Sequence, residues 1–179
     1  MKILIVSGFL GAGKTTFIKR LARNVDQRFA ILENEYGAAG IDGARLGQNR
    51  QGTQKNVWEM TEQCICCIGK KDFAASVLTI ANVVDPEYLI VEPTGVGSLA
   101  RIIENLRQIE YERIQLLSPV TIVDVYSYRR YMAEYPELYQ DQIRSADTII
   151  VSKTEACQAE EKQRIQKFLQ EINSQAKII

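Results

Sequence analysis

The stretch Gly8-Phe9-Leu10-Gly11-Ala12-Gly13-Lys14-Thr15 decides the fold, because it fits the pattern G-x-x-x-x-G-K-[ST] at every fixed position. The apolar run at residues 2–7 before it is typical of a buried strand, and residues 16–24 after it have a helical pattern. The sequence therefore predicts a strand, a glycine-rich loop and a helix in direct succession. A glycine turn with only a structural role is the alternative, and the complete match in this context argues against it.

A loop of this kind is suited to bind a chain of phosphate groups. Its glycines let successive backbone N–H groups point inward, and the following helix adds partial positive charge at its N-terminus. Lys14 brings a full charge to the β- and γ-phosphates, and the Thr15 hydroxyl is a ligand for Mg²⁺, which prefers oxygen. The loop residues expected to bind the nucleotide are Gly8, Gly11, Ala12, Gly13, Lys14, Thr15 and Thr16.

A carboxylate and a glycine follow a second apolar run. Glu92 ends this run and is expected to hold the magnesium ion through a bound water, while the amide of Gly95 is expected to approach the terminal phosphate. Loss of that phosphate would release the loop and so operate a two-state switch. With Lys14 and Thr15, these two residues form the expected catalytic set. The alternative is that Glu92 only caps a helix expected at residues 97–108.

A third acidic segment, Glu33-Asn34-Glu35-Tyr36-Gly37, closes another expected strand at the same edge of the sheet. Its carboxylates are candidates to approach Mg²⁺ or a second metal ion, and Glu35 is the first choice. A solvated acidic turn is the alternative for each carboxylate taken singly. Residues 36–56 are rich in Gly, Gln and Asn and predict a long loop.

Three cysteines crowd into four positions, as Cys64, Cys66 and Cys67. The chain contains no histidine, so a site for a soft metal must rely on thiolates, with carboxylates or water in support. A turn that joins the three sulfurs favours Zn²⁺, Cu⁺ or a related ion and leaves one coordination position open, which suits exchange of the metal. A redox dithiol and ordinary buried cysteines are the alternatives, and the separate Cys157 is expected to be structural.

Size and composition indicate the fold class and exclude some kinds of partner. With 179 residues, of which 46% are hydrophobic, the chain can bury one core. Lys and Arg number 22 and so do Asp and Glu, so no bulk positive field is present to hold nucleic acid or a membrane. Because no early apolar stretch is long enough to span a membrane and no secretory signal is evident, a cytoplasmic location is expected.

Apolar runs alternate with amphipathic helical patterns along the chain. This alternation predicts an α/β, three-layer P-loop NTPase fold, in which a mostly parallel sheet is flanked by helices. Strands are expected at residues 2–7, 29–33, 88–92, 120–124 and 148–152, with another beginning at residue 177, and helices at residues 16–24, 97–108 and 161–172.

Taken in order along the chain, these motifs resemble those of the CobW-type GTPases, metallochaperone relatives of the GTPases that supply nickel to hydrogenase and urease. The resemblance includes that family's phosphate loop, its Asn-Glu-Phe-Gly segment, its Cys-x-Cys-Cys motif and its Glu-Thr-Thr-Gly switch, and it spans nearly the whole chain. The matching segments are residues 8–16, 33–37, 64–67 and 92–95, followed by two later core strands at residues 120–124 and 146–151.

The resemblance implies a single GTPase domain at residues 1–179 that hydrolyses GTP to GDP and phosphate, gated by metal at the three cysteines. It implies Mg²⁺ beside the nucleotide, Zn²⁺ or Co²⁺ as cargo, and delivery to a client metalloenzyme or a corrinoid pathway. In the family a second domain follows, and that domain is expected to be absent here. The expected partners are guanine nucleotide, a transition-metal ion, a client metalloenzyme and a second copy of the chain as a possible homodimer.

The element that reads the base departs from the family, which has Asn-Lys-x-Asp where this chain has Ser152-Lys153-Thr154-Glu155. A carboxylate that accepts from N1–H and the amino group of guanine rejects adenine, and Glu155 can do so with one extra methylene. Lys153 is expected to lay its stem along the base, but Ser152 cannot make all the bonds of an asparagine amide. We therefore expect GTP to be preferred, with less selectivity over ATP.

No obvious base to activate water is present, so we expect slow intrinsic hydrolysis that rises when metal or a partner binds. Two alternatives remain from the sequence. One is a regulatory module in which nucleotide switches a binding surface and zinc is structural. The other is a small P-loop kinase, with Arg129-Arg130 as a lid over the phosphates.

Overall fold

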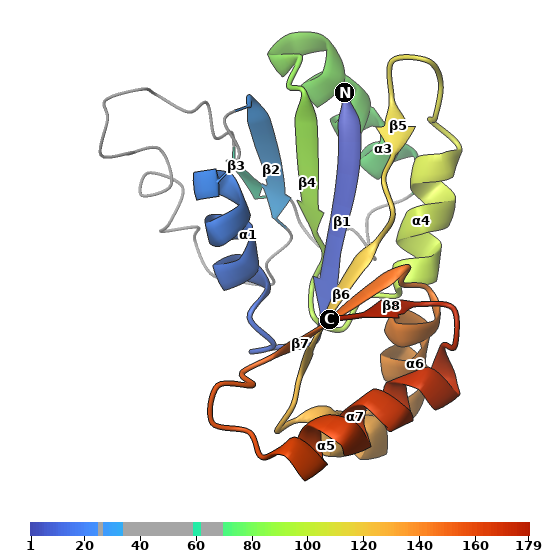
Figure 1. Cartoon of the computed structure of the whole chain (residues 1–179). Coiled ribbons are helices and arrows are strands. Elements are labelled where there is room, and N and C mark those ends of the chain that lie inside the picture. The colour runs from blue at the N-terminus through green and yellow to red at the C-terminus, as the bar shows by residue number, and fades with distance from the viewer. Residues whose placement is uncertain (25–26, 34–58, 62–69) are drawn as a thin grey trace.

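The computed structural model describes residues 1–24, 27–33, 59–61 and 70–179, which form one sheet with helices on both faces (Figure 1). Its strands lie in the order β3-β2-β4-β1-β6-β7-β8, and β5 pairs with β1 outside this path. Every one of these pairings is parallel. The strands are β1 (Lys2–Gly8), β2 (Phe29–Glu33), β3 (Glu59–Thr61), β4 (Tyr88–Glu92), β5 (Gln115–Leu116), β6 (Val120–Asp124), β7 (Thr148–Ser152) and β8 (Lys177–Ile178).

The helices connect these strands and form the two outer layers. They are α1 (Lys14–Asn24), α3 (Lys70–Thr79), a π-helical turn (Ile80–Val84), α4 (Leu99–Arg107), α5 (Tyr128–Glu134), α6 (Pro136–Arg144) and α7 (Ala159–Ile172). Within the described residues, no helix combines the length and the apolar character needed to cross a membrane.

Two apolar cores lie on opposite faces of the sheet, because successive side chains of a strand point to opposite faces. On β1, Ile3 and Ile5 belong to the larger core, which α3, α4, α6 and α7 cover. Val6 faces the smaller core, where Ile18 and Ala22 of α1 lie. Strands buried on both faces are near-continuous apolar runs, as observed for β1, β4 and β6. The predicted three-layer α/β fold is confirmed.

The boundaries differ from the expected ones at several elements. α1 begins at Lys14 rather than residue 16, since the glycine loop leads directly into the first helical turn. α4 covers Leu99–Arg107, inside the expected residues 97–108, because Ser98 is its N-cap. The short strands β3 and β5 were not expected, whereas the strand predicted to begin at residue 177 is present as β8. The predicted loop at residues 36–56 lies outside the described residues.

Candidate functional site

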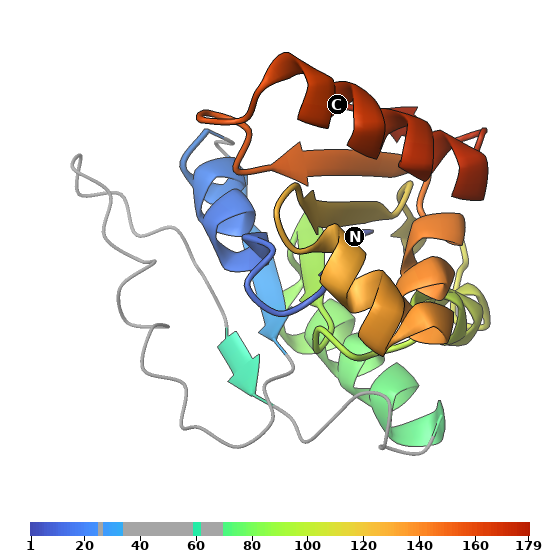
Figure 2. The same cartoon turned by 90° about the horizontal axis from the view of Figure 1, so that it is seen from below.

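The carboxyl ends of the central parallel strands meet at one edge of the sheet, and Figure 2 looks at this edge. The loop after β1 leads into α1 here, and the segments that follow β4, β6 and β7 begin beside it. Connections at this edge of an open parallel sheet are where ligands bind in α/β proteins. The residues singled out after these strands therefore share one location.

The glycine loop has the backbone shape that its pattern predicts. Gly8, Gly11 and Gly13 have φ angles of 145°, 73° and 102°, a range that side chains strongly disfavour. At Gly8 there is also no room, because a Cβ would lie 2.5 Å from the carbonyl oxygen of Ile122 on β6. The loop is thus pressed against the neighbouring strand, and the Ala12 amide donates a hydrogen bond to the Phe9 carbonyl oxygen at 3.1 Å within the loop.

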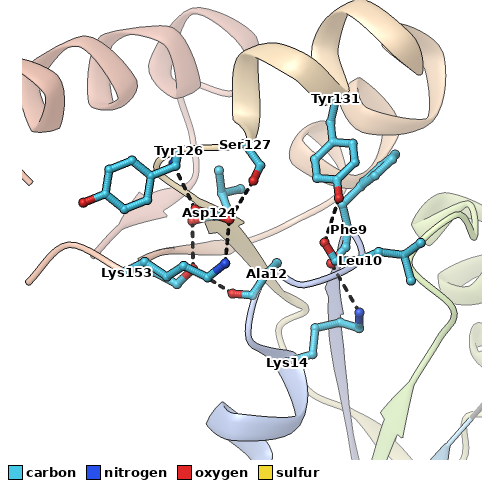
Figure 3. Close-up of polar contacts among 11 residues, drawn as sticks. Phe9, Leu10, Ala12, Lys14, Asp124, Tyr126, Ser127, Tyr131 and Lys153 are labelled. Atoms are coloured by element: carbon cyan, nitrogen blue, oxygen red, sulfur yellow. Dashed lines mark hydrogen bonds and ion pairs between the residues drawn. The ribbon is translucent and has the colours of Figure 1, made fainter.

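Lys14, Thr15 and Glu92 come together at the start of α1. The Thr15 hydroxyl donates a hydrogen bond to Glu92 Oε1 at 3.2 Å, and Lys14 Nζ lies 4.0 Å from the same carboxylate oxygen. Lys14 Nζ also donates to the Phe9 carbonyl oxygen at 3.5 Å (Figure 3), so its ammonium lies over the loop. Its side chain is only 9% exposed. The structure thus joins the ammonium and the hydroxyl of two adjacent residues with a carboxylate 77 positions after the hydroxyl in the sequence.

The helix after β4 takes its N-terminal cap from other residues than Glu92. Ser98 Oγ accepts a hydrogen bond from the Arg101 amide at 3.3 Å. Asp141 Oδ2, from α6, accepts from the amides of Leu99 at 2.7 Å and Ala100 at 3.4 Å. The alternative reading, in which Glu92 serves only as this cap, is therefore not what the structure shows.

Gly95 lies directly against the glycine loop. A Cβ on Gly95 would approach the Leu10 amide nitrogen to 2.6 Å, so only glycine allows this contact. The turn that contains it is closed by a hydrogen bond from the Gly97 amide to the Thr94 carbonyl oxygen at 3.0 Å. Sequence reasoning placed Gly95 near the phosphates, and the structure places its backbone beside the loop expected to hold them.

The segment after β7 contacts the glycine loop as well. Ser152 Oγ donates to the Ala12 carbonyl oxygen at 2.7 Å, a bond that links positions 140 residues apart. Lys153 has a left-handed backbone, with φ of 60°, and its Nζ lies 2.8 Å from Asp124 Oδ2 (Figure 3). Glu155 is exposed. Three residues were expected to read the base. Ser152 hydrogen-bonds the glycine loop, Lys153 forms an ion pair with Asp124, and Glu155 has an exposed side chain.

Asp124, at the end of β6, is a site residue to which the sequence assigned no specific role. Its carboxylate is 6% exposed and accepts hydrogen bonds from Lys153 Nζ, from the Tyr126 amide at 2.9 Å and from Ser127 Oγ at 2.7 Å. Burial alone would raise the pKa of the Asp124 carboxyl, but these donors and the nearby ammonium lower it below its ordinary value of 3.8. The carboxylate is thus held ionised beside the expected base-binding segment.

Three tyrosines on α5, on α6 and at the junction between them pack around Phe9 of the glycine loop. Tyr131 donates its hydroxyl to the Leu10 carbonyl oxygen at 2.9 Å (Figure 3). The Phe9 ring lies against it and two more tyrosine rings, with ring centroids 4.6 to 5.7 Å apart. Sequence reasoning missed this contact, because Tyr131 and Leu10 are 121 positions apart in the sequence. The rings are those of Tyr131, Tyr135 and Tyr139.

Arg129 and Arg130, considered as a phosphate lid, are engaged elsewhere. Arg129 donates through Nε to the Tyr128 hydroxyl at 2.9 Å and forms an ion pair with Glu161 of α7 at 3.4 Å. The Arg130 guanidinium lies over the Tyr131 ring, 4.7 Å from its centroid. These contacts do not favour a lid.

Several predicted metal ligands lie outside the described residues, namely Glu35, Cys64, Cys66 and Cys67. The structure therefore does not test the thiolate site. Cys157 is a free thiol and packs, half-buried, against the larger core, which agrees with its expected structural role.

Comparison with known proteins adds the family. The model for the CobW/HypB/UreG nucleotide-binding domain matches residues 2–179. Curated relatives include the zinc chaperone YeiR of Escherichia coli (strain K12), which is 30% identical over 178 residues that cover 98% of this chain and 53% of that protein. The zinc chaperone CobW of Pseudomonas aeruginosa is 27% identical, with 92% of this chain and 52% of that protein covered. The chain thus spans about half the length of the curated relatives it matches.

Solved structures agree on the fold. The crystal structure of the Zn(II)-bound YjiA GTPase from E. coli superposes with a TM-score of 0.73 at 21% identity, covering all of this chain and 57% of that one. The hydrogenase maturation factor HypB from Archaeoglobus fulgidus gives 0.65 at 17% identity, covering all of this chain and 80% of that one. Since the family model covers every residue but the first, the chain belongs to the CobW/HypB/UreG family of nucleotide-binding domains.

Proposed function

We propose that this chain binds GTP and GDP with Mg²⁺, hydrolyses GTP slowly, and couples the nucleotide state to a transition-metal ion held at Cys64, Cys66 and Cys67. The metal cargo is Zn²⁺ or Co²⁺, and the recipient is a client metalloenzyme or a corrinoid pathway. Residues 1–179 act as the GTPase domain in this scheme. One observation supports the proposal above the others: Lys14, Thr15 and Glu92 lie together beside a loop in which Gly8, Gly11 and Gly13 have positive φ angles.

The residues present suit a magnesium ion. Thr15 Oγ1 and Glu92 Oε1 lie 3.2 Å apart, and a hydroxyl and a carboxylate are ligands that Mg²⁺ accepts, directly or through water. We infer that these two residues hold the ion beside the nucleotide. When bound, Mg²⁺ would neutralise charge on the terminal phosphates.

The chain's own groups account for binding and orientation of the nucleotide. The loop amides and the Lys14 ammonium bind the phosphates, where charge develops during hydrolysis. Gly95 brings its backbone to the same loop, so its amide orients the terminal phosphate. Because the chain contains no histidine and no other obvious base, the proposal includes slow turnover in the absence of metal or client.

The base is the less selective end of the proposed site. Glu155 is exposed and free to approach the edge of guanine, while Lys153 is held by Asp124 in the structure. We propose that GTP is preferred over ATP and that the preference is weaker than in relatives with an Asn-Lys-x-Asp element.

The relatives' names support metal delivery, because YeiR and CobW are described as zinc chaperones. A second copy of the chain is a further possible partner. The alternative function, a regulatory module with structural zinc, predicts that zinc affinity does not depend on the bound nucleotide. In a delivery protein the metal and the nucleotide must influence each other, and thermodynamic linkage makes that influence reciprocal.

Competition titration of Zn²⁺ against a chromogenic chelator tests this coupling. The apparent zinc affinity is measured with Mg²⁺ and either a non-hydrolysable GTP analogue or GDP. We expect the two affinities to differ by about fivefold or more, the lower end of ordinary coupling energies. Cys66→Ser should abolish the difference, whereas the control Cys157→Ser, at a cysteine distant in sequence, should preserve it. Equal zinc affinities in the two nucleotide states would rule out delivery gated by GTP.

A further inference from the structure

A buried glutamine on α6 binds the turn that contains Gly95. Gln142 is 1% exposed, and its Nε2 donates to the carbonyl oxygens of Gly95 and Gly97, each at 3.0 Å. Since carbonyl oxygens only accept hydrogen bonds, the NH₂ end of the amide must face them. Among the described residues, Gln142 Oε1 has no hydrogen-bond partner, so the contribution of this side chain is donation to the turn.

The turn is fixed from two sides. On one side, the close approach of Gly95 to the Leu10 amide leaves no space for movement toward the glycine loop. On the other side, the two bonds from Gln142 hold the carbonyls on either side of Val96. The backbone position of the turn that contains Gly95 is therefore fixed by the glycine loop and by α6 together.

The helix that carries Gln142 is itself anchored. Its main-chain oxygen at Gln142 accepts a bond from the buried Thr121 hydroxyl on β6 at 3.0 Å. The preceding residue, Asp141, caps α4, which begins two residues after the turn. In addition, Tyr131 on the adjoining α5 donates to Leu10 in the glycine loop. α5 and α6 thus contact both segments that the terminal phosphate would touch.

We propose that Gln142 is a positioning residue for the terminal phosphate, which sets how strongly the protein prefers a nucleoside triphosphate over a diphosphate. This inference rests on the proposed function. Gln142 does not touch the nucleotide. It keeps the turn ordered before binding, so a triphosphate meets the Gly95 amide without first having to order the segment. A diphosphate has no group for this amide, so it gains nothing from the order.

The test uses Gln142→Met, which keeps the approximate length of the side chain and removes both donors. Affinities for GDP and for a non-hydrolysable GTP analogue are measured by calorimetry with Mg²⁺. We expect analogue affinity to fall about tenfold, as for loss of a stabilising hydrogen-bond pair, while GDP affinity stays within about twofold. The ratio kcat/KM for GTP hydrolysis should fall with the analogue affinity. A merely structural role would lower Tm and leave the ratio of the two affinities unchanged.

Gln140→Leu is the matched control, because Gln140 lies on the same helix but contacts Met132 and Arg144 instead. It should leave the ratio unchanged. If Gln142→Met does not fold, Gln142→Asn carries the test, since its shorter amide cannot reach both carbonyls and should lower the ratio by a smaller factor. A wild-type protein that binds neither nucleotide would overturn the proposed function as well. If it binds both and the Gln142 variants keep the wild-type ratio, only this inference is overturned.

Discussion

Lys14 carries most of the charge that the glycine loop offers to an anion. Its ammonium lies 3.5 Å from the Phe9 carbonyl oxygen and 4.0 Å from Glu92, so it already points into the cradle that phosphates would fill. The attraction between this ammonium and one unit of phosphate charge about 4 Å away would contribute roughly 4 kcal/mol if the effective dielectric constant is about 20. The loss of ammonium hydration offsets part of this.

We expect Lys14→Ala to lower the affinity for GTP by about a hundredfold or more, because the remaining amides must hold the phosphates without the ammonium. Isothermal titration calorimetry with Mg²⁺ measures the change. Arg20→Ala is the control, since Arg20 is exposed further along α1. Unchanged GTP affinity in Lys14→Ala would contradict the assignment of the loop.

Asp124 links stability to pH. Its folded-state pKa is lowered, so its ionised form stabilises the fold above the ordinary carboxyl value of 3.8, and this contribution is lost as pH falls through the lowered pKa. Asp124→Asn should reduce the free energy of unfolding by about 1.5–3 kcal/mol at pH 7, because three donors lose a charged acceptor. Urea unfolding at pH 7 and at pH 3 measures this. The difference from wild type should shrink at pH 3, and a difference that does not depend on pH would refute the role of ionisation.

At the scale of helices and strands, α4 depends on a neighbour for its start. Asp141 on α6 accepts from the first two amides of α4, and its charge also favours the positive end of that helix. Ser98 accepts from one further amide. α4 and α6 are therefore joined by a polar contact at their ends as well as by their shared apolar core.

Asp141→Ala should lower the free energy of unfolding by about 1–2 kcal/mol, the usual cost of losing an N-terminal cap. Chemical denaturation at pH 7 measures it. Gln140→Ala, one position earlier and pointing to other partners, should change stability much less. If both variants lost the same free energy of unfolding, the loss would come from helix propensity and not from the missing N-terminal cap.

The elements that the sequence predicted well are those with a strong local pattern. β4 and β6 are continuous apolar runs, and β1 leads into a motif that fixes a loop and a helix. β5 has only two residues and β3 three, which is too short for any periodic pattern to show. Their positions follow from pairing with longer strands, which a local reading of the chain does not contain.

The candidate site shows the same division. Lys14, Thr15 and Glu92 were predicted because a motif or the end of an apolar run marks each of them. The bonds from Gln142 to the Gly95 turn, and from Tyr131 to Leu10, join residues 47 and 121 positions apart. No spacing rule connects such residues, because a glutamine within a helix is ordinarily a surface residue.

At the scale of the whole molecule, the sheet brings loops from four strands to one edge, and two apolar cores hold those strands in place. Leu89 of β4 and Ile5 of β1 are fully buried in the larger core. The sheet is therefore buried between two apolar layers, and the nucleotide would contact the segments that emerge from it. A domain built in this way can change its loops with the nucleotide while its strands stay in register.

The hydrogen bond between Ser152 and Ala12 has a consequence for how the fit of the base would affect nucleotide affinity. The Ser152 hydroxyl joins the segment proposed to bind the nucleobase to the glycine loop proposed to bind the phosphates. A purine that fits this segment poorly would displace Ser152, and the displacement would reach the Ala12 carbonyl in the phosphate-binding loop through this hydrogen bond. Recognition of the base and affinity for the phosphates would thus be coupled, so that a poorly fitting base would also weaken phosphate binding.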